Sequence, residues 1–338
     1  MRQVWITRRG APEVLQVRET KDPMPQSGEA LIRVKASGIN FADILARKGL
    51  YPDAPKLPCV VGYEVAGEIE KIGDGVDESL VGKPVLAVTR FGGYSDQVIL
   101  PAGQVFEKPK ALSFEEAAAL PVNYLTAYQL VIAMGGLKRD ESVLIHNAGG
   151  GVGLAALELA KRIGAKTYGT ASPNKHAFLL KRGLDHAIDY RQHDWLKILD
   201  QLTEDRGVEL VLDPIGGSNW MKSYRALRST GRLGFFGVSS LSGQGERSIW
   251  QLIKFLVQIP KFSPIRLMNA NTGVFGVNLG HLWSEGGKIR AWMGTILQGV
   301  DEGWIHPHVD KSFPFDKASE AHRYIEERKN TGKVVLIP

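Results

Sequence analysis

The spacing of apolar residues changes along the chain near residue 113. Up to about residue 110, short runs such as "EALIRVKASGI" and "VAGEIEKIG" alternate or are β-branched, and Gly, Pro and Asp separate them. This pattern predicts strands of a small barrel or sandwich. From about Glu141, near-continuous apolar strands alternate with amphipathic helices, which predicts a parallel sheet covered on both faces. The pattern therefore indicates a β-rich domain followed by an α/β domain.

The change itself is marked by helix signals. Ser113 precedes Glu116 by three residues, which is a capping-box pattern, and "AAALPVNYLTAYQLVIAM" continues with helical spacing that Pro121 interrupts. After about residue 277 the elements are mixed again, and the chain ends in an apolar strand, "KVVLIP". With 338 residues, two domains are the natural expectation.

One apolar segment, residues 248–268, stands apart. Between Ile249 and Ile259 only Gln251, Lys254 and Gln258 are polar, on one helical stripe, and Pro260 ends the helix. The stretch is too short to span a bilayer. Three coverings stay open: its own domain or a dimer mate, the substrate cleft, or a membrane surface. Our hypothesis is a lid over the cleft entrance; peripheral membrane contact is an alternative.

Composition narrows the class of protein. Hydrophobic residues make up 43% and charged residues 23%, and the net charge of +6 is scattered, so nucleic acid is not expected as the main partner. Cys59 is the only cysteine, which excludes an intramolecular disulfide and a thiolate-rich zinc site. No secretory signal or spanning stretch is recognised, so we expect a cytoplasmic protein.

A glycine-rich loop carries the main chemical signal. It lies between the strand "ESVLIHN" and the helix "LAALELAKRIG", the context in which bare backbone approaches a dinucleotide phosphate. Its residues are Ala148, Gly149, Gly150, Gly151, Val152 and Gly153.

The next strand ends in "TYGTASPNK", without the carboxylate that usually binds the ribose hydroxyls of NAD. Ser172 and Lys175 could meet a 2'-phosphate instead, which favours NADPH. Lys175 could also be an ordinary solvated lysine. Tyr190 either flanks the adenosine or is a plain strand-end aromatic.

Two further stretches, "ASGINFADILARKGLYP" and "LPCVVGYEVAGEIEKIGDGV", resemble the medium-chain dehydrogenase/reductase superfamily over essentially the whole chain. Where the zinc alcohol dehydrogenases of that superfamily have metal-binding cysteine and histidine, this chain has Asn40 and Tyr63, and the structural-zinc lobe is absent. We therefore expect no metal. The N-F-x-D pattern is similar to the quinone oxidoreductase and zeta-crystallin branch, and "LPVNYLTAY", "GVNLGHL" and "NTGKVVLIP" resemble its vesicle amine transport protein group.

The resemblance implies a GroES-like catalytic domain over residues 1–123 and 278–338, and a Rossmann domain over 124–277. It places Asn40, Asp43 and Thr126 near the nicotinamide, and Tyr51 at the mouth of the cleft. The further cofactor residues that it implies are Ser172, Lys175, Tyr190, Val238, Ser239, Phe275, Asn278 and Arg328. A purely structural role stays open for three of these residues: Asn40 as a turn residue, Asp43 as a helix cap, and Phe275 as a core residue.

The sequence thus predicts a zinc-independent reductase that uses NADPH to reduce a quinone or activated enone. Tyr51 and Tyr63 are the candidate proton donors, although Tyr63 could merely fill the vacated zinc pocket. The alternatives are an enoyl-thioester reductase and a redox-inactive NADPH-binding protein that acts through partners or a membrane. The segment "NTGVFGV" is expected at the sheet edge of a homodimer.

Overall fold

The computed structural model describes residues 1–242, 255 and 257–338, which form two compact units. Unit 1 is Met1–Leu125 with Gly280–Pro338, and unit 2 is Thr126–Leu279. The predicted boundaries lie two residues before each observed one. The predicted apolar helix from Ile249 to Ile259, with its role as a lid, lies mostly outside the described residues.

Unit 2 is built on a six-stranded sheet in which every neighbouring pair is parallel. The strand order is β11-β10-β9-β12-β13-β14, so the winding direction reverses beside β9, where an open sheet of this type binds its ligand. Residues 143–145 of β9 are completely buried because the sheet is covered on both faces. The strands are β9 Ser142–His146, β10 Lys166–Ala171, β11 His186–Asp189, β12 Val208–Asp213, β13 Leu227–Phe235 and β14 Gly273–Gly276.

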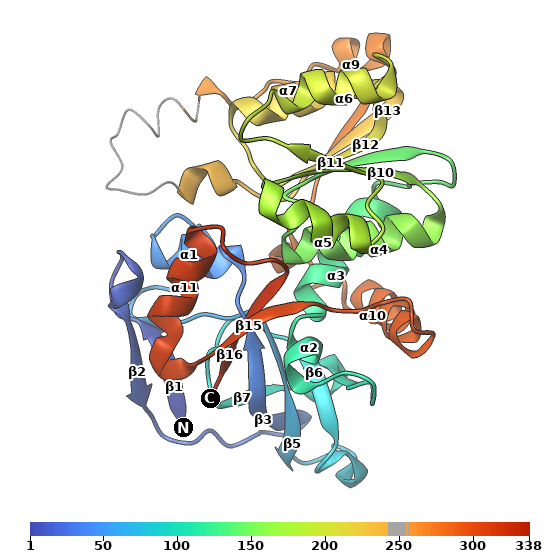
Figure 1. Cartoon of the computed structure of the whole chain (residues 1–338). Helices are drawn as coiled ribbons and strands as arrows, with labels where there is room; N and C mark the ends of the chain where they lie inside the picture. The colour runs from blue at the N-terminus through green and yellow to red at the C-terminus, as the bar shows by residue number, and fades with distance from the viewer. Residues whose placement is uncertain (243–254, 256) are drawn as a thin grey trace. The chain divides into compact units, whose positions relative to one another are not determined.

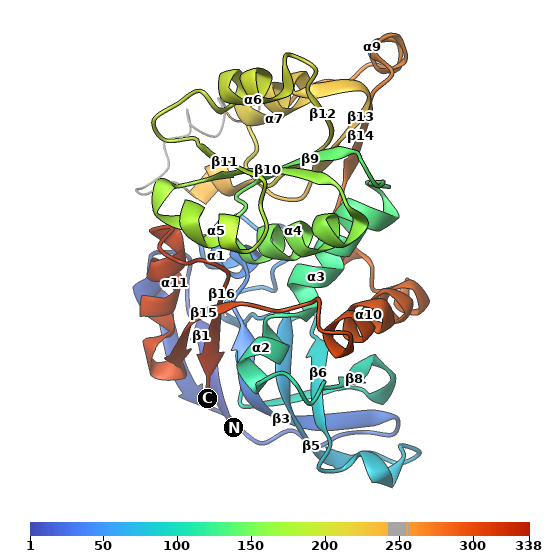
Figure 2. The same ribbon diagram turned by 45° about the vertical axis from the view of Figure 1, so that its right-hand side comes forward.

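Helices cover both faces of this sheet: α4 and α5 lie on one side, and α6 and α7 on the other (Figures 1 and 2). They are α4 Gly151–Ile163, α5 His176–Lys181, α6 Trp195–Thr203 and α7 Ser218–Arg225, followed by the short α9 Pro264–Ala270. The chain enters unit 2 along α3, Pro121–Tyr128, which continues as a π-helical stretch, Gln129–Ala133.

Unit 1 combines a mostly antiparallel seven-stranded sheet with a three-stranded one. The larger sheet has the order β15-β16-β3-β5-β6-β8, with β7 paired to β3, and the smaller has the order β2-β1-β4. The strands are β1 Arg2–Ile6, β2 Leu15–Glu19, β3 Glu29–Gly38, β4 Cys59–Val60, β5 Glu64–Ile72, β6 Pro84–Val88, β7 Gln97–Pro101, β8 Val105–Glu107, β15 Val309–Pro314 and β16 Lys333–Ile337. Its helices are α1 Phe41–Arg47, α2 Phe114–Ala118, α10 Gly286–Asp301 and α11 Ala318–Glu326.

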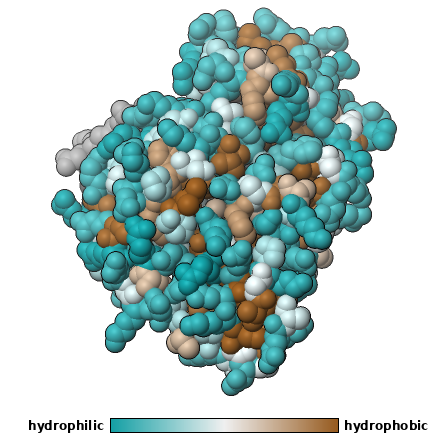
Figure 3. All heavy atoms as spheres, turned by 60° about the horizontal axis from the view of Figure 1, so that its bottom comes forward, coloured by the Kyte–Doolittle hydropathy of each residue, from teal (hydrophilic) through white to brown (hydrophobic). Residues whose placement is uncertain are grey.

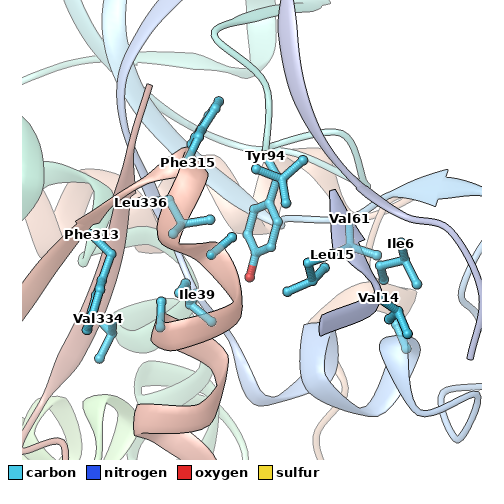
Figure 4. Close-up of a cluster of buried hydrophobic side chains, with 14 of the residues drawn as sticks. Ile6, Val14, Leu15, Ile39, Val61, Tyr94, Phe313, Phe315, Val334 and Leu336 are labelled. Carbon is cyan, nitrogen blue, oxygen red and sulfur yellow. The ribbon is translucent and has the colours of Figure 1, made fainter. Parts of the chain in front are cut away.

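A buried apolar cluster joins the two sheets and α11 of unit 1. Figure 4 shows Tyr94 in its middle, between Leu336 of β16 on one side and Leu15 and Val61 on the other. The ring of Tyr94 is completely buried. Because Ile39 and Val61 belong to this cluster, it holds in place the turns that carry Asn40 and Tyr63.

The predicted signals around residue 113 are confirmed. Ser113 and Glu116 form the capping box of α2, and Pro121 is the first residue of α3, where proline is tolerated. The face of the molecule in Figure 3 is largely hydrophilic, with small separate groups of hydrophobic side chains. Within the described ranges, no helix is both long and apolar enough to cross a membrane.

Candidate functional site

The glycine loop of unit 2 lies at the carboxyl end of β9 and opens α4. Gly150 is the N-cap of the helix and has no side chain to cap it, so the first N–H groups of α4 can face an anion. A Cβ atom on Gly153 would lie only 2.4 Å from the carbonyl oxygen of Asn147. The helix can approach the loop this closely because residue 153 is glycine.

Ser172 and Lys175 directly follow β10, next to this loop. The Ser172 hydroxyl is buried and donates to the side-chain oxygen of Asn174 at 2.7 Å. The Lys175 side chain is 7% exposed, and its stem lies 2.8 Å from where a Cβ atom of Gly149 would be. Lys175 is therefore packed across the glycine loop, and the solvated alternative for it is wrong.

The other predicted cofactor residues are spread over both units. Thr126 is buried at the start of unit 2, Tyr190 packs at the rim of a unit 2 core, and Arg328 is exposed in unit 1. The Phe275 ring lies 2.8 Å from where a Cβ atom of Gly234 would be, so it packs against the sheet. Val238 and Ser239, after β13, are half-buried, and Asn278, after β14, is exposed.

Beneath the glycine loop lies a buried polar network that the sequence analysis missed. His146, the last residue of β9, meets Thr170 at 2.9 Å and Ser223 at 3.1 Å, and Ser223 donates to Asp213 at 2.6 Å. Because the Ser223 proton is used on Asp213, the Nε2 atom of His146 must carry a hydrogen and donate it. Burial lowers the pKa of His146 to about 4, so its ring is neutral.

In unit 1, Asn40 belongs to a second buried network. Its Nδ2 donates to Glu64 Oε1 at 2.9 Å, and its Oδ1 accepts from Lys333 Nζ at 2.7 Å. Lys333 also pairs with Glu64, and both side chains are almost completely buried. The two contacts fix which way the Asn40 amide points, because the carboxylate can only accept and the ammonium can only donate.

Asp43 lies one helical turn into α1, and Asn40 is the N-cap residue of that helix. The completely buried Asp43 carboxyl accepts from the Asn40 N–H at 2.8 Å and from the Gly62 N–H at 3.1 Å. Burial raises the pKa of Asp43 to about 7 against the effect of these hydrogen bonds. Asp43 therefore acts on the site by holding the turns of Asn40 and Gly62 in place. Its bond to the Asn40 N–H is part of a capping box, so the helix-cap alternative describes part of its role.

Aromatic side chains surround Tyr63, the next predicted site residue of unit 1. The Tyr63 ring lies 6.1 Å from that of Tyr51 and 5.2 Å from that of Phe91. No described residue meets the Tyr63 hydroxyl with hydrogen-bond geometry. Burial is the main cause that raises the pKa of Tyr63 far above its usual range, and Asp43 and Tyr51 add to it. Tyr63 is therefore a protonated donor at any physiological pH.

A resident metal does not fit the atoms present in unit 1. Asn40 and Tyr63 are poor zinc ligands, and the ammonium of Lys333 already neutralises Glu64. Over the ranges that the structure describes, no three His, Cys, Asp or Glu side chains are grouped to hold an ion.

Comparison with known proteins agrees with this architecture. Residues 26–110 match the family model described as alcohol dehydrogenase GroES-like domain, and residues 182–336 match the model described as zinc-binding dehydrogenase. The human synaptic vesicle membrane protein VAT-1 homolog is 38% identical over 325 residues, which cover 96% of this chain and 82% of that protein.

Two solved structures extend the comparison. The Escherichia coli quinone oxidoreductase complexed with NADPH has a TM-score of 0.86 at 31% identity, with all of both chains covered. The CurK enoyl reductase has a TM-score of 0.84 at 29% identity, covering 99% of this chain and 98% of that one.

A GroES-like unit joined to a six-stranded parallel sheet with a glycine loop is the architecture of the medium-chain dehydrogenase/reductase superfamily, and the chain belongs to it. Within that superfamily of oxidoreductases, the chain is a member of the zeta-crystallin and quinone oxidoreductase branch, in the VAT-1 group.

Sequence reasoning missed Glu64, Lys333, Tyr94 and His322. The signal that could have found Glu64 and Lys333 is a charged residue at the head of an otherwise apolar strand, in "EVAGEI" and "KVVLI". Such a residue is buried with the strand and needs a charged partner.

Proposed function

We propose that this chain is a zinc-independent, NADPH-dependent reductase of quinones and activated enones. The observation that carries the proposal is the glycine loop at the start of α4, with Lys175 packed across Gly149. An enzyme specific for NAD usually has a carboxylate in the segment after β10, and this chain has Ser172 and Lys175 there instead. A Cβ atom on Gly149 would meet the Lys175 stem and one on Gly153 would meet the loop backbone, so these glycines let Lys175 and α4 pack closely against the loop. Bound NADPH would supply a hydride to the acceptor.

Lys175 and Ser172 provide the charge and the hydroxyl that suit a 2'-phosphate. Lys175 is only 7% exposed, so its side chain is already ordered and loses little entropy on binding an anion. The fit is therefore better for NADPH than for NADH.

The acceptor side of the proposal lies in unit 1. A planar quinone or enone suits the aromatic group of Tyr51, Tyr63 and Phe91. The Tyr63 hydroxyl, which keeps its proton, donates a hydrogen bond to the oxygen that gains negative charge, and the proton that completes the new O–H bond comes from solvent. The Asn40 amide, held by Glu64 and Lys333, has a second hydrogen that can meet the developing negative charge on oxygen.

The test is steady-state NADPH oxidation with a small quinone, an alkyl enone and an enoyl thioester. We expect turnover with the first two, and a loss of kcat of roughly 10²-fold in Tyr63→Phe, which removes a hydrogen-bond donor to the developing charge. Preferred reduction of the thioester would favour an enoyl reductase, the activity for which CurK enoyl reductase is named. NADPH binding in calorimetry without turnover of any acceptor would favour a redox-inactive binding protein.

The absence of a zinc step is tested separately. Because Lys333 neutralises Glu64 and the side chain of Asn40 is bonded to both, elemental analysis of the purified protein should find no stoichiometric zinc. One zinc per chain that resists dialysis against a chelator would contradict this.

A further inference from the structure

Behind Asn40 and Tyr63, a chain of hydrogen bonds in the interior of unit 1 starts on α1 at Arg47, passes through α11 and Tyr94, and returns to α1 at Asp43. Arg47 lies 3.4 Å from Nδ1 of His322, whose Nε2 lies 3.1 Å from the Tyr94 hydroxyl. That hydroxyl donates to Asp43 Oδ2 at 3.0 Å. All four side chains are completely buried, although three of them have no direct part in the proposed chemistry.

The direction of this chain is fixed at one end. A guanidinium has donors only, so Nδ1 of His322 must accept and Nε2 must carry the ring hydrogen. The Tyr94 oxygen then accepts from Nε2, and its own hydrogen points to Asp43. Arg47 is itself held by Glu326 at 2.7 Å. The chain cannot reverse, so Tyr94 always presents a donor to Asp43.

Asp43 is the point where this chain reaches the site. Its two oxygens bind the N–H groups of Asn40 and Gly62, which lie in two separate turns. The first turn carries the Asn40 amide, and the second leads directly into Tyr63. The Asp43 carboxylate thus links the turn of Asn40 to the turn of Tyr63, the two residues that contact the substrate in the proposed function.

We propose that Tyr94 and His322 are positioning residues: by holding Asp43 as an acceptor, they fix the Tyr63 hydroxyl relative to the Asn40 amide. The inference rests on the proposed function only where it concerns turnover. The hydroxyl of Tyr94 contributes a bond that a phenylalanine ring, which fills the same apolar space (Figure 4), cannot make.

The charges around Asp43 and Tyr94 set the sign of the expected effect. Lys333 of β16 and the Tyr94 hydrogen bond lower the pKa of Asp43, while burial raises it to about 7. Burial and Asp43 raise the pKa of Tyr94 well above its usual value; Arg47 of α1 opposes this and Glu64 of β5 adds to it. Asp43 also raises the pKa of Tyr63, and Arg47 and burial keep His322 neutral. Loss of the Tyr94 hydroxyl must therefore raise the pKa of Asp43.

The experiment follows Asp43 directly, by carbon NMR of protein labelled at the aspartate carboxyls, with Asp43→Asn identifying the signal. We expect the titration midpoint to rise by about one pH unit in Tyr94→Phe and to rise in His322→Leu. His322→Gln, which keeps an N–H donor, should leave the Asp43 midpoint at its wild-type value. The matched control is Tyr324→Phe, which removes another tyrosine-to-aspartate bond of unit 1, to Asp310 at 2.8 Å, and should change nothing.

Turnover supplies the second readout. The acidic limb of kcat for a small quinone should move with the Asp43 midpoint, while the KM for NADPH stays constant. An unmoved midpoint in Tyr94→Phe, or a kcat limb that ignores a moved midpoint, overturns the inference. If the wild-type protein reduces no quinone or enone, the proposed function fails, and the NMR titration alone decides whether the chain holds Asp43.

Discussion

At the scale of single residues, Lys175 shows how burial can prepare a charge for binding. A lysine at a helix start is usually solvated, yet here the loop that Gly149 leaves bare accommodates its stem. The stem of Lys175 is thereby held beside the glycine loop. In the proposed function, the charge of Lys175 is the feature that favours NADPH over NADH.

We predict that Lys175→Ala weakens NADPH binding by roughly 1–3 kcal/mol and NADH binding much less, because only NADPH loses a charged hydrogen bond. Calorimetric titration of both cofactors checks this. Lys181→Ala, which removes an exposed lysine at the end of α5, serves as the control. Equal losses for the two cofactors would remove Lys175 from the 2'-phosphate role.

His146 leads to a prediction about acid stability. Its pKa is about 4 in the folded protein against 6.5 for a free histidine, so between these values the unfolded chain binds a proton that the folded one does not. Acidification through this window should destabilise the folded state by up to about 3 kcal/mol. Full stability from this group is present above pH 6.5.

The measurement is the free energy of unfolding from pH 7.5 to 4.5, compared between the wild-type protein and His146→Gln. The difference between the two isolates His146, because Asp43, with its raised pKa, contributes the opposite slope in both. A difference that stays constant with pH would show that His146 does not titrate in this way.

At the scale of elements, identical substitutions should have opposite effects in two helices. Gly153 lies in the first turn of α4, and Gly153→Ala puts a methyl group 2.4 Å from the carbonyl oxygen of Asn147. This substitution should lower the free energy of unfolding by roughly 1–3 kcal/mol. Gly294→Ala lies inside α10 with nothing within 4 Å and should stabilise by about 0.5–1 kcal/mol.

Urea unfolding of the two variants checks this pair. Gly153→Ala should also weaken NADPH binding, since α4 must move away from the loop, whereas Gly294→Ala should bind normally. If Gly153→Ala unfolds like the wild-type protein, the close approach of helix and loop is not needed.

At the scale of the whole molecule, the parallel sheet ends at β14. The prediction that "NTGVFGV" forms this edge strand is confirmed. An uncovered edge exposes unpaired backbone groups, so we expect two copies to pair there across a two-fold axis.

Light scattering at micromolar concentration should report a dimer. The Val277 N–H points back to β13, bonding Phe235 at 2.8 Å, so by alternation the Gly276 N–H faces outward. Gly276→Pro removes that outward donor and should weaken the dimer while leaving the inner ladder intact. A wild-type protein that is only monomeric would contradict the pairing.

The sequence by itself determined those features that depend on neighbours along the chain. The alternation of strands and helices, the capping box at Ser113 and the glycine loop after β9 are local, because periodicity and bare backbone act within a few residues. The likeness to a known superfamily came from such local motifs.

The tertiary structure alone decided the interior of the site. His322 meets Arg47 across 275 residues and Tyr94 across 228, and no local pattern marks such pairs. Lys333 likewise meets Asn40 across 293 residues. A buried polar group must find its partner wherever the folded chain brings one. Only packing could therefore show that Lys333 of β16 holds Asn40, and that His322 of α11 acts on Asp43 through Tyr94.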